Sequence, residues 1–201
     1  KDFTYLHPEV INNKCRIKDS KLVLNNIINN EKYSILIVPS MKTISVANLK
    51  IIEKFYNAGG CILFTTQLPE QSVEFGQNER VKNTINRILH TPKGRGKAFF
   101  IQSPSSETVK RILDLCNVTF DVDFVNQQPL NYIHKIYDNR SVYYFANLSK
   151  SPRNSEIVLK GKIHPVLFNP HTGETSEIPF THQTKNKTEV TVLTLSLDGN
   201  S

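Results

Sequence analysis

Histidine and cysteine are the residue types here that most readily bind metals or act as nucleophiles, and their spacing favours neither role. None of the six histidines belongs to an H-x-x-H or H-E-x-x-H pattern. They are His7, His90, His134, His164, His171 and His182. Cys15, Cys61 and Cys116 contain no C-x-x-C pair, and we interpret them as small buried hydrophobic residues. The sequence therefore predicts no metal site and no cofactor.

Paired carboxylates are the second kind of chemistry to consider. Asp121 and Asp123 are two residues apart, so in a strand they would share one face. Hydrolysis of a glycosidic bond needs two carboxyl groups that converge on it from opposite sides, and no second pair is available. We interpret these two residues as part of a solvated strand edge.

The turns that follow the buried strands are where open α/β sheets bind ligands. The turn at 67–70 reads Gln-Leu-Pro-Glu and has no Cys or Ser at its apex to serve as a nucleophile. Gly94-Arg95-Gly96 leads into a strand, whereas a phosphate-binding loop leads into a helix, so we interpret it as a flexible basic turn. We therefore assign no catalytic residue.

Exposed aromatic rings are the remaining candidates, because sugars stack on them, and the chain has no Trp. A predicted hairpin near residue 135 carries Tyr132, Tyr137 and Tyr144, which we take as candidate carbohydrate-binding residues. Alternation along a strand places Tyr143 and Tyr144 on opposite faces, so one should be buried and the other exposed.

The first half of the chain has the pattern of alternating strands and helices. Apolar runs at 33–39, 61–66 and 98–102 predict strands that are buried on both faces. A helix should begin after Ser45 and end at Gly59-Gly60. Two further helices should carry apolar stripes at 81–89 and 109–116.

This order predicts a doubly wound, mostly parallel sheet over residues 1–127. Before it, residues 2–6 could form an edge strand, and 14–24 a hairpin that turns at Asp19-Ser20. A complete domain of this kind would begin with its own strand and helix, so we expect the first βα unit to be missing.

From about residue 130 the hydrophobic period changes from 3.6 to 2. Two short strands flank a turn at Asp138-Asn139, and further strand patterns follow to residue 197. Residues 128–201 are therefore predicted to form a small antiparallel β-sandwich.

Composition excludes some classes of function. The charge of +7 over 201 residues is diffuse, since residues 1–125 carry 17 Lys and Arg against 12 Asp and Glu. Nucleic-acid binders show longer basic runs, so we expect no nucleic-acid partner. No run approaches the roughly 20 apolar residues of a membrane span.

Several segments, in this order, resemble the C-terminal region of α-L-rhamnosidase-like glycoside hydrolases of family 106. These are large secreted or periplasmic enzymes common in polysaccharide-degrading Bacteroidetes. The segments are 33–45, 57–64, 93–97, 131–135, 144–147 and 168–174.

The resemblance implies a flavodoxin- or amidotransferase-like domain without its nucleophile, followed by a β-domain, with catalysis on an upstream barrel. We therefore expect a non-catalytic accessory region of a secreted or periplasmic enzyme. Its partners would be the upstream catalytic domain of the same polypeptide and a polysaccharide. The alternatives are a carbohydrate-binding module and a subunit-assembly domain, the role of a similar domain in family 42 β-galactosidases.

Overall fold

The computed structural model describes residues 4–25, 30–90, 94–118, 120–126, 128–138, 140–185 and 188–201. The chain divides into two compact units. One contains residues 5–119, and the other contains residues 120–201 together with Thr4. None of the helices in the described residues has the length and hydrophobicity needed to cross a lipid bilayer.

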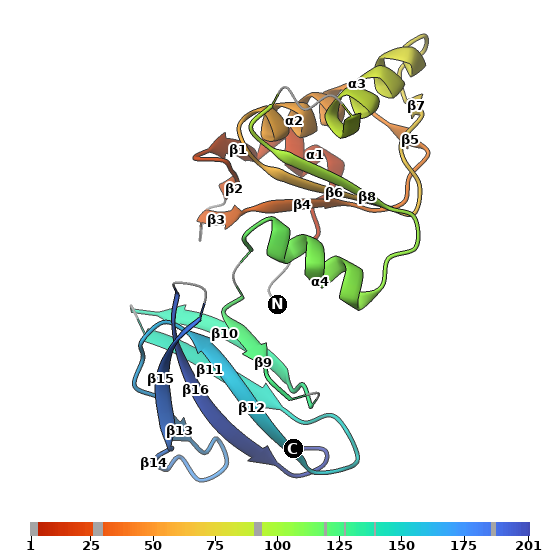
Figure 1. The fold of residues 1–201 in the computed structure, drawn as a ribbon. Coiled ribbons are helices and arrows are strands. Elements are labelled where there is room, and N and C mark those ends of the chain that lie inside the picture. The colour runs from red at the N-terminus through yellow and green to blue at the C-terminus, as the bar shows by residue number, and fades with distance from the viewer. Residues whose placement is uncertain are drawn as a thin grey trace. The chain divides into compact units, whose positions relative to one another are not determined.

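A three-stranded parallel sheet forms the centre of the first unit, with its strands in the order β4-β6-β8. These strands are Ile35–Val38, Cys61–Thr65 and Lys97–Ile101. Two helices, α2 (Val46–Asn57) and α3 (Asn78–His90), cover one face, and α4 (Ser106–Leu115) covers the other (Figure 1). Helices on both faces explain why β6 is almost entirely apolar and buried.

The ends of α2 follow from local chemistry, as predicted. The Ser45 side chain accepts a hydrogen bond from the backbone N–H of Asn48 at 3.2 Å. Gly59 adopts a φ of 100°, a conformation that only glycine takes without strain, and the helix ends just before it. An ion pair between Arg87 and Glu53 joins α3 to α2.

The rest of the first unit consists of short elements. After α1 (Pro8–Asn13) comes an antiparallel sheet of three strands, β1, β2 and β3. These are Cys15–Lys18, Lys21–Asn25 and Asn30–Tyr33. The predicted hairpin turn is confirmed at Asp19 and Ser20, whose φ values of 51° and 59° are typical of a type I′ turn. Two short strands, β5 (Thr43–Ile44) and β7 (Gln71–Ser72), pair in parallel.

The doubly wound parallel sheet predicted over residues 1–127 is wrong. Such a sheet reverses its strand order about the first strand, whereas β4-β6-β8 advances in one direction, with no reversal in the described part of the chain. The apolar run at 33–39 bends at Ser34, so its first residue ends the antiparallel β3. Of the edge strand predicted at 2–6, Asp2 and Phe3 lie outside the described residues, and the remainder forms no strand.

The second unit is built from antiparallel strands, in place of the first unit's alternation with helices. A four-stranded sheet has the order β15-β16-β12-β9, and two separate pairs are β10-β11 and β13-β14. The strands are β9 Val122–Phe124, β10 Asn131–Tyr137, β11 Arg140–Ala146, β12 Arg153–Lys160, β13 Val166–Phe168, β14 Thr175–Glu177, β15 Phe180–Lys185 and β16 Thr188–Leu197. Because β9 pairs with β12, the strand at 122–124 belongs to this unit.

The core of this unit lies between the four-stranded sheet and the β10-β11 hairpin. Ile157 of β12 and Leu193 of β16 are buried there. Tyr132 and Phe145, directly paired across β10 and β11, pack against the same cluster. One face of the hairpin is therefore internal, and this leaves its other face outside.

Candidate functional site

The outer face of the β10-β11 hairpin carries two of the three candidate tyrosines. Residues that pair directly across two antiparallel strands share a face, and the register pairs Ile133 with Tyr144 and Tyr137 with Arg140. Tyr137 and Tyr144 are 73% and 55% exposed. We call Ile133, Lys135, Tyr137, Arg140, Val142 and Tyr144 the hairpin face.

The third candidate, Tyr132, lies on the opposite, internal face. Its ring centroid is 6.4 Å from that of Phe124 and 6.1 Å from that of Phe145. It is therefore part of the core, and it cannot act together with the other two on one ligand. Tyr143 is also internal, whereas Tyr144 is exposed, as strand alternation predicts.

One histidine of the second unit, His134, has a buried side chain. The His134 side chain is only 9% exposed, its Nδ1 lies 3.4 Å from Oδ2 of Asp121, and its ring stacks on Tyr143 with centroids 4.2 Å apart. Burial is the main reason why the pKa of Tyr143 is raised. Asp123 does not share this arrangement, since its carboxylate accepts a hydrogen bond from the N–H of Phe124.

The turn after β6 contains a strained residue that sequence analysis did not identify. Thr66 has a φ of 64°, which is unusual for a β-branched residue. Its N–H donates to the carbonyl of Ile101 at 2.7 Å, which helps to hold the turn in place. Among the described residues, no histidine or carboxylate hydrogen-bonds to its hydroxyl.

The glycines before β8 serve packing. A Cβ atom at Gly94 would lie 2.6 Å from the ring of Tyr56, and one at Gly96 would collide with the carbonyl oxygens of Tyr56 and Gly60. The segment therefore needs glycine in order to approach the end of α2 closely. The two glycines thus allow the basic turn to pack against the end of α2.

Two of the three cysteines form a disulfide, which the sequence did not predict. Cys61 at the start of β6 is bonded to Cys116 at the end of α4, 55 residues later, with Cα atoms 6.1 Å apart. Cys15 is free and half-buried, and its burial raises the pKa of the thiol. Within the described ranges, no three His, Cys, Asp or Glu side chains are close enough to hold a metal ion.

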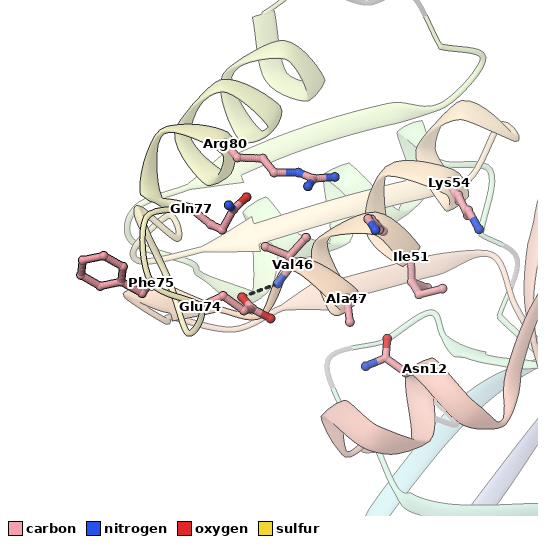
Figure 2. Close-up of a pocket in the computed structure, with 10 residues that line it drawn as sticks. Asn12, Val46, Ala47, Ile51, Lys54, Glu74, Phe75, Gln77 and Arg80 are labelled. Carbon is pink, nitrogen blue, oxygen red and sulfur yellow. Dashed lines mark hydrogen bonds between the residues drawn. The ribbon is translucent and has the colours of Figure 1, made fainter.

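An open groove of about 670 Å³ lies in the first unit beside α2 (Figure 2). We call it the basic groove because Lys50 and Lys54 of α2 and Arg80 of α3 line it, against a single carboxylate, that of Glu74. In Figure 2, Arg80 extends from α3 toward α2, and Asn12 of α1 lies across from it. Three positive side chains thus gather around one opening.

The Glu74 carboxylate is fixed at one end of the basic groove. Its Oε2 accepts a hydrogen bond from the Val46 N–H, in the first turn of α2, at 3.0 Å (Figure 2). It also accepts one from the Ser72 hydroxyl at 2.6 Å. These two bonds, the one from Ser72 first, lower the pKa of Glu74, and the charge of Arg80 acts in the same direction. The groove therefore already accommodates one ionised carboxylate at the helix N-terminus.

Sequence comparison identifies a family. The sequence profile of glycoside hydrolase family 106, described as alpha-L-rhamnosidase, matches residues 1–182. Among curated protein sequences, none is significantly similar to the chain.

Three solved structures show related folds. The rhamnosidase from Novosphingobium sp. PP1Y aligns with 95% of this chain at 16% identity and a TM-score of 0.73. A GH42 beta-galactosidase from G. stearothermophilus aligns with 82% of the chain at 11% identity and a TM-score of 0.51. The beta-galactosidase from Bacillus circulans sp. alkalophilus aligns with 82% of the chain at 10% identity and a TM-score of 0.51. The chain covers 18%, 32% and 33% of these proteins, respectively.

Proposed function

This chain belongs to the family 106 glycoside hydrolases, and from this membership we propose that it is a non-catalytic accessory region of an enzyme that acts on polysaccharide. The observation that carries the proposal is the coverage: 95% of the chain aligns with only 18% of a rhamnosidase. Most of such an enzyme lies outside the part that this chain resembles. We place the catalytic domain in that remainder, upstream in the same polypeptide.

The carboxylates of the second unit support a non-catalytic role. Glycosidases hold two carboxyl groups about 5–9.5 Å apart across the bond that is broken. Here Asp121 is occupied by its contact with His134, and Asp123 accepts a hydrogen bond from the backbone beside it. Both carboxyl groups therefore already have partners within this unit.

The test is hydrolysis of a 4-nitrophenyl α-L-rhamnoside. The 201-residue chain should release no nitrophenol, and a longer family 106 enzyme assayed in parallel should release it. If any activity is found, the variants Asp121→Asn and Asp123→Asn test whether either carboxyl group is responsible for it. Turnover by the purified chain that disappears in one of these variants would show that the chain is itself catalytic.

The disulfide supports the proposal that the enzyme is secreted or periplasmic. Disulfides persist in oxidising compartments and are rare where thioredoxin and glutathione keep thiols reduced. The bond between Cys61 and Cys116 joins a central strand to a helix of the same unit. Fractionation of the native host cells should place the protein outside the cytoplasm, and purely cytoplasmic recovery would contradict this localisation.

A second candidate function, carbohydrate binding, is favoured by the hairpin face. Tyr137 and Tyr144 are exposed on one surface, where aromatic rings are available to stack on sugars. Tyr137→Ala and Tyr144→Ala should each weaken oligosaccharide binding measured by calorimetry, and Tyr5→Ala, which removes an exposed tyrosine of the other unit, should not. Binding that is equal in all three variants would remove this candidate.

Subunit assembly is a third candidate, because Ile133 and Val142 on the same face are each 55% exposed. Exposed apolar side chains that adjoin one another often mark protein interfaces. Light scattering over a range of concentrations should then show a dimer that Val142→Lys dissociates. A constant monomer mass would exclude assembly through this face.

A further inference from the structure

The basic groove has a charge arrangement that the fold itself does not require. Lys50 and Lys54 are four residues apart on α2, so their side chains lie one above the other on the same helix face, about 6 Å apart along the axis. Like charges at this spacing destabilise a helix. Neither lysine forms an ion pair with another residue in the part of the chain that the structure describes.

Two other cations of α3 are each paired with a carboxylate. Lys82 of α3 lies 3.2 Å from Glu79, and Arg87 pairs with Glu53 of α2. In the basic groove, three cations face the single carboxylate of Glu74, which leaves an excess of two positive charges at one opening. An anionic ligand would relieve this repulsion.

Glu74 shows what kind of group the site accepts. Its carboxylate accepts hydrogen bonds from the backbone N–H of Val46, at the start of α2, and from the Ser72 hydroxyl. A helix N-terminus and neighbouring cations together favour an anionic group. Glu74 thus occupies one anion position, and the lysines beyond it provide others.

We propose that the basic groove binds an acidic oligosaccharide, one whose sugars carry carboxylate or sulfate groups. The sugar part of this assignment rests on the proposed function in a polysaccharide-degrading enzyme, whereas the anionic part rests on the groove alone. The anionic groups of successive sugars contact Lys50, Lys54 and Arg80, and the open groove of about 670 Å³ has room for more than one sugar ring. Asn12 and Gln77 add polar side chains for hydroxyl groups.

Phe75 provides a platform at the end of the groove. Its side chain is fully exposed and projects outward in Figure 2, although it belongs to the same lining. Covering one face of a solvent-exposed aromatic ring with an apolar surface is energetically favourable, and the C–H face of a sugar is such a surface. A sugar at the end of a bound chain stacks on this ring.

The experiment is isothermal titration calorimetry on the full 201-residue chain at low and high salt. The probes are trigalacturonate, a sulfated galactose trisaccharide, the neutral trisaccharide maltotriose and sodium sulfate. The proposal expects the acidic trisaccharides to bind, and binding should weaken as salt rises from 20 to 200 mM, since these contacts are exposed. Comparison of the two acidic probes identifies whether carboxylate or sulfate is preferred.

Charge-neutral variants locate the site. Lys50→Gln, Lys54→Gln and Arg80→Gln should each weaken binding about two- to fivefold, the usual effect of one exposed ionic contact. Lys82→Gln is the matched control, because it makes the same charge change on α3 outside the groove. Glu74→Gln should tighten binding by a similar factor, because it removes the one negative charge from the lining.

A gain of affinity in Glu74→Gln cannot come from misfolding. This variant therefore distinguishes an effect of charge from a loss of structure. Equal binding of maltotriose and the acidic trisaccharides, no binding of either acidic probe, or an equal effect of Lys82→Gln would each overturn the proposal. Binding requires no catalysis, so such a failure leaves the accessory role to be judged by the rhamnoside assay.

Discussion

The side chain of Asn147 should be the most important single polar group for the stability of the second unit. It is 1% exposed, and its Nδ2 donates to the carbonyls of Ser151, Leu197 and Asp198 at 2.9, 3.2 and 2.8 Å. Its Oδ1 accepts from the N–H and the hydroxyl of Ser149 at 3.1 and 2.6 Å. One amide thus connects the segment after β11 to the end of β16.

The cost of removing this amide follows from these contacts. Each hydrogen bond contributes about 0.5–1.5 kcal/mol net, and a carbonyl left buried without a partner costs more. Three carbonyls lose their donor in Asn147→Ala, although those near the chain end regain some contact with water. We expect the free energy of unfolding of this unit to fall by about 3 kcal/mol.

Asn147→Asp tests the direction of the hydrogen bonds without creating a cavity. The new carboxylate oxygen would face three carbonyl oxygens, so the loss of stability at neutral pH should equal or exceed that of the alanine variant. Stability relative to the parent should partly recover as pH falls, because a protonated carboxyl group can donate one hydrogen bond.

Hydrogen exchange measured by mass spectrometry is the appropriate assay, because the chain has two units that need not unfold together. Peptides from β16 should exchange about a hundredfold faster in Asn147→Ala, the equivalent of roughly 3 kcal/mol. Asn131→Ala, at an exposed position of β10, is the matched control and should change exchange little. If the two variants are indistinguishable, the reasoning from hydrogen-bond number is refuted.

Three further predictions concern the first unit. The denatured, unreduced chain should contain one thiol that reacts with Ellman's reagent, that of Cys15. Replacement of both Cys61 and Cys116 with alanine should lower the free energy of unfolding by about 4 kcal/mol, since their disulfide closes a long loop. Gly96→Ala should lower it by about 1–3 kcal/mol in urea denaturation, because the new Cβ would collide with two backbone carbonyl oxygens. Thr66→Gly should raise the free energy of unfolding by about 0.5–1 kcal/mol, because relief of the strain of the left-handed conformation outweighs the greater entropy of glycine in the unfolded chain. A loss of stability would contradict that account.

Features that depend on local chemistry could be predicted from the sequence. Ser45 caps α2, Gly59 ends it, and Asp19-Ser20 forms a two-residue hairpin turn. In each case the residues that decide the structure are within a few positions of one another. The change of hydrophobic period near residue 130 likewise agrees with the structure, because every element of secondary structure described after α4 is a strand.

Features that depend on distant partners could not be predicted. A continuous apolar run shows that a strand is buried on both faces, and it does not show which strands adjoin it. The order β4-β6-β8 and the separate antiparallel sheet before it are set by contacts between segments far apart in sequence. The same holds for the Cys61–Cys116 bond, since three widely spaced cysteines allow three pairings. It holds also for the basic groove, whose cations come from two helices.

The candidate tyrosines show what strand alternation and hairpin register can and cannot predict. Tyr132 and Tyr137 are five positions apart on one strand, so strict alternation already requires them to face opposite sides. The register of the hairpin pairs Tyr137 with Arg140 and Ile133 with Tyr144, which places Tyr144 on the side of Tyr137. Alternation and register together therefore separate Tyr132 from the other two. They do not decide which side is internal, because both faces carry large apolar residues, and only the packing of Tyr132 on the four-stranded sheet makes that choice.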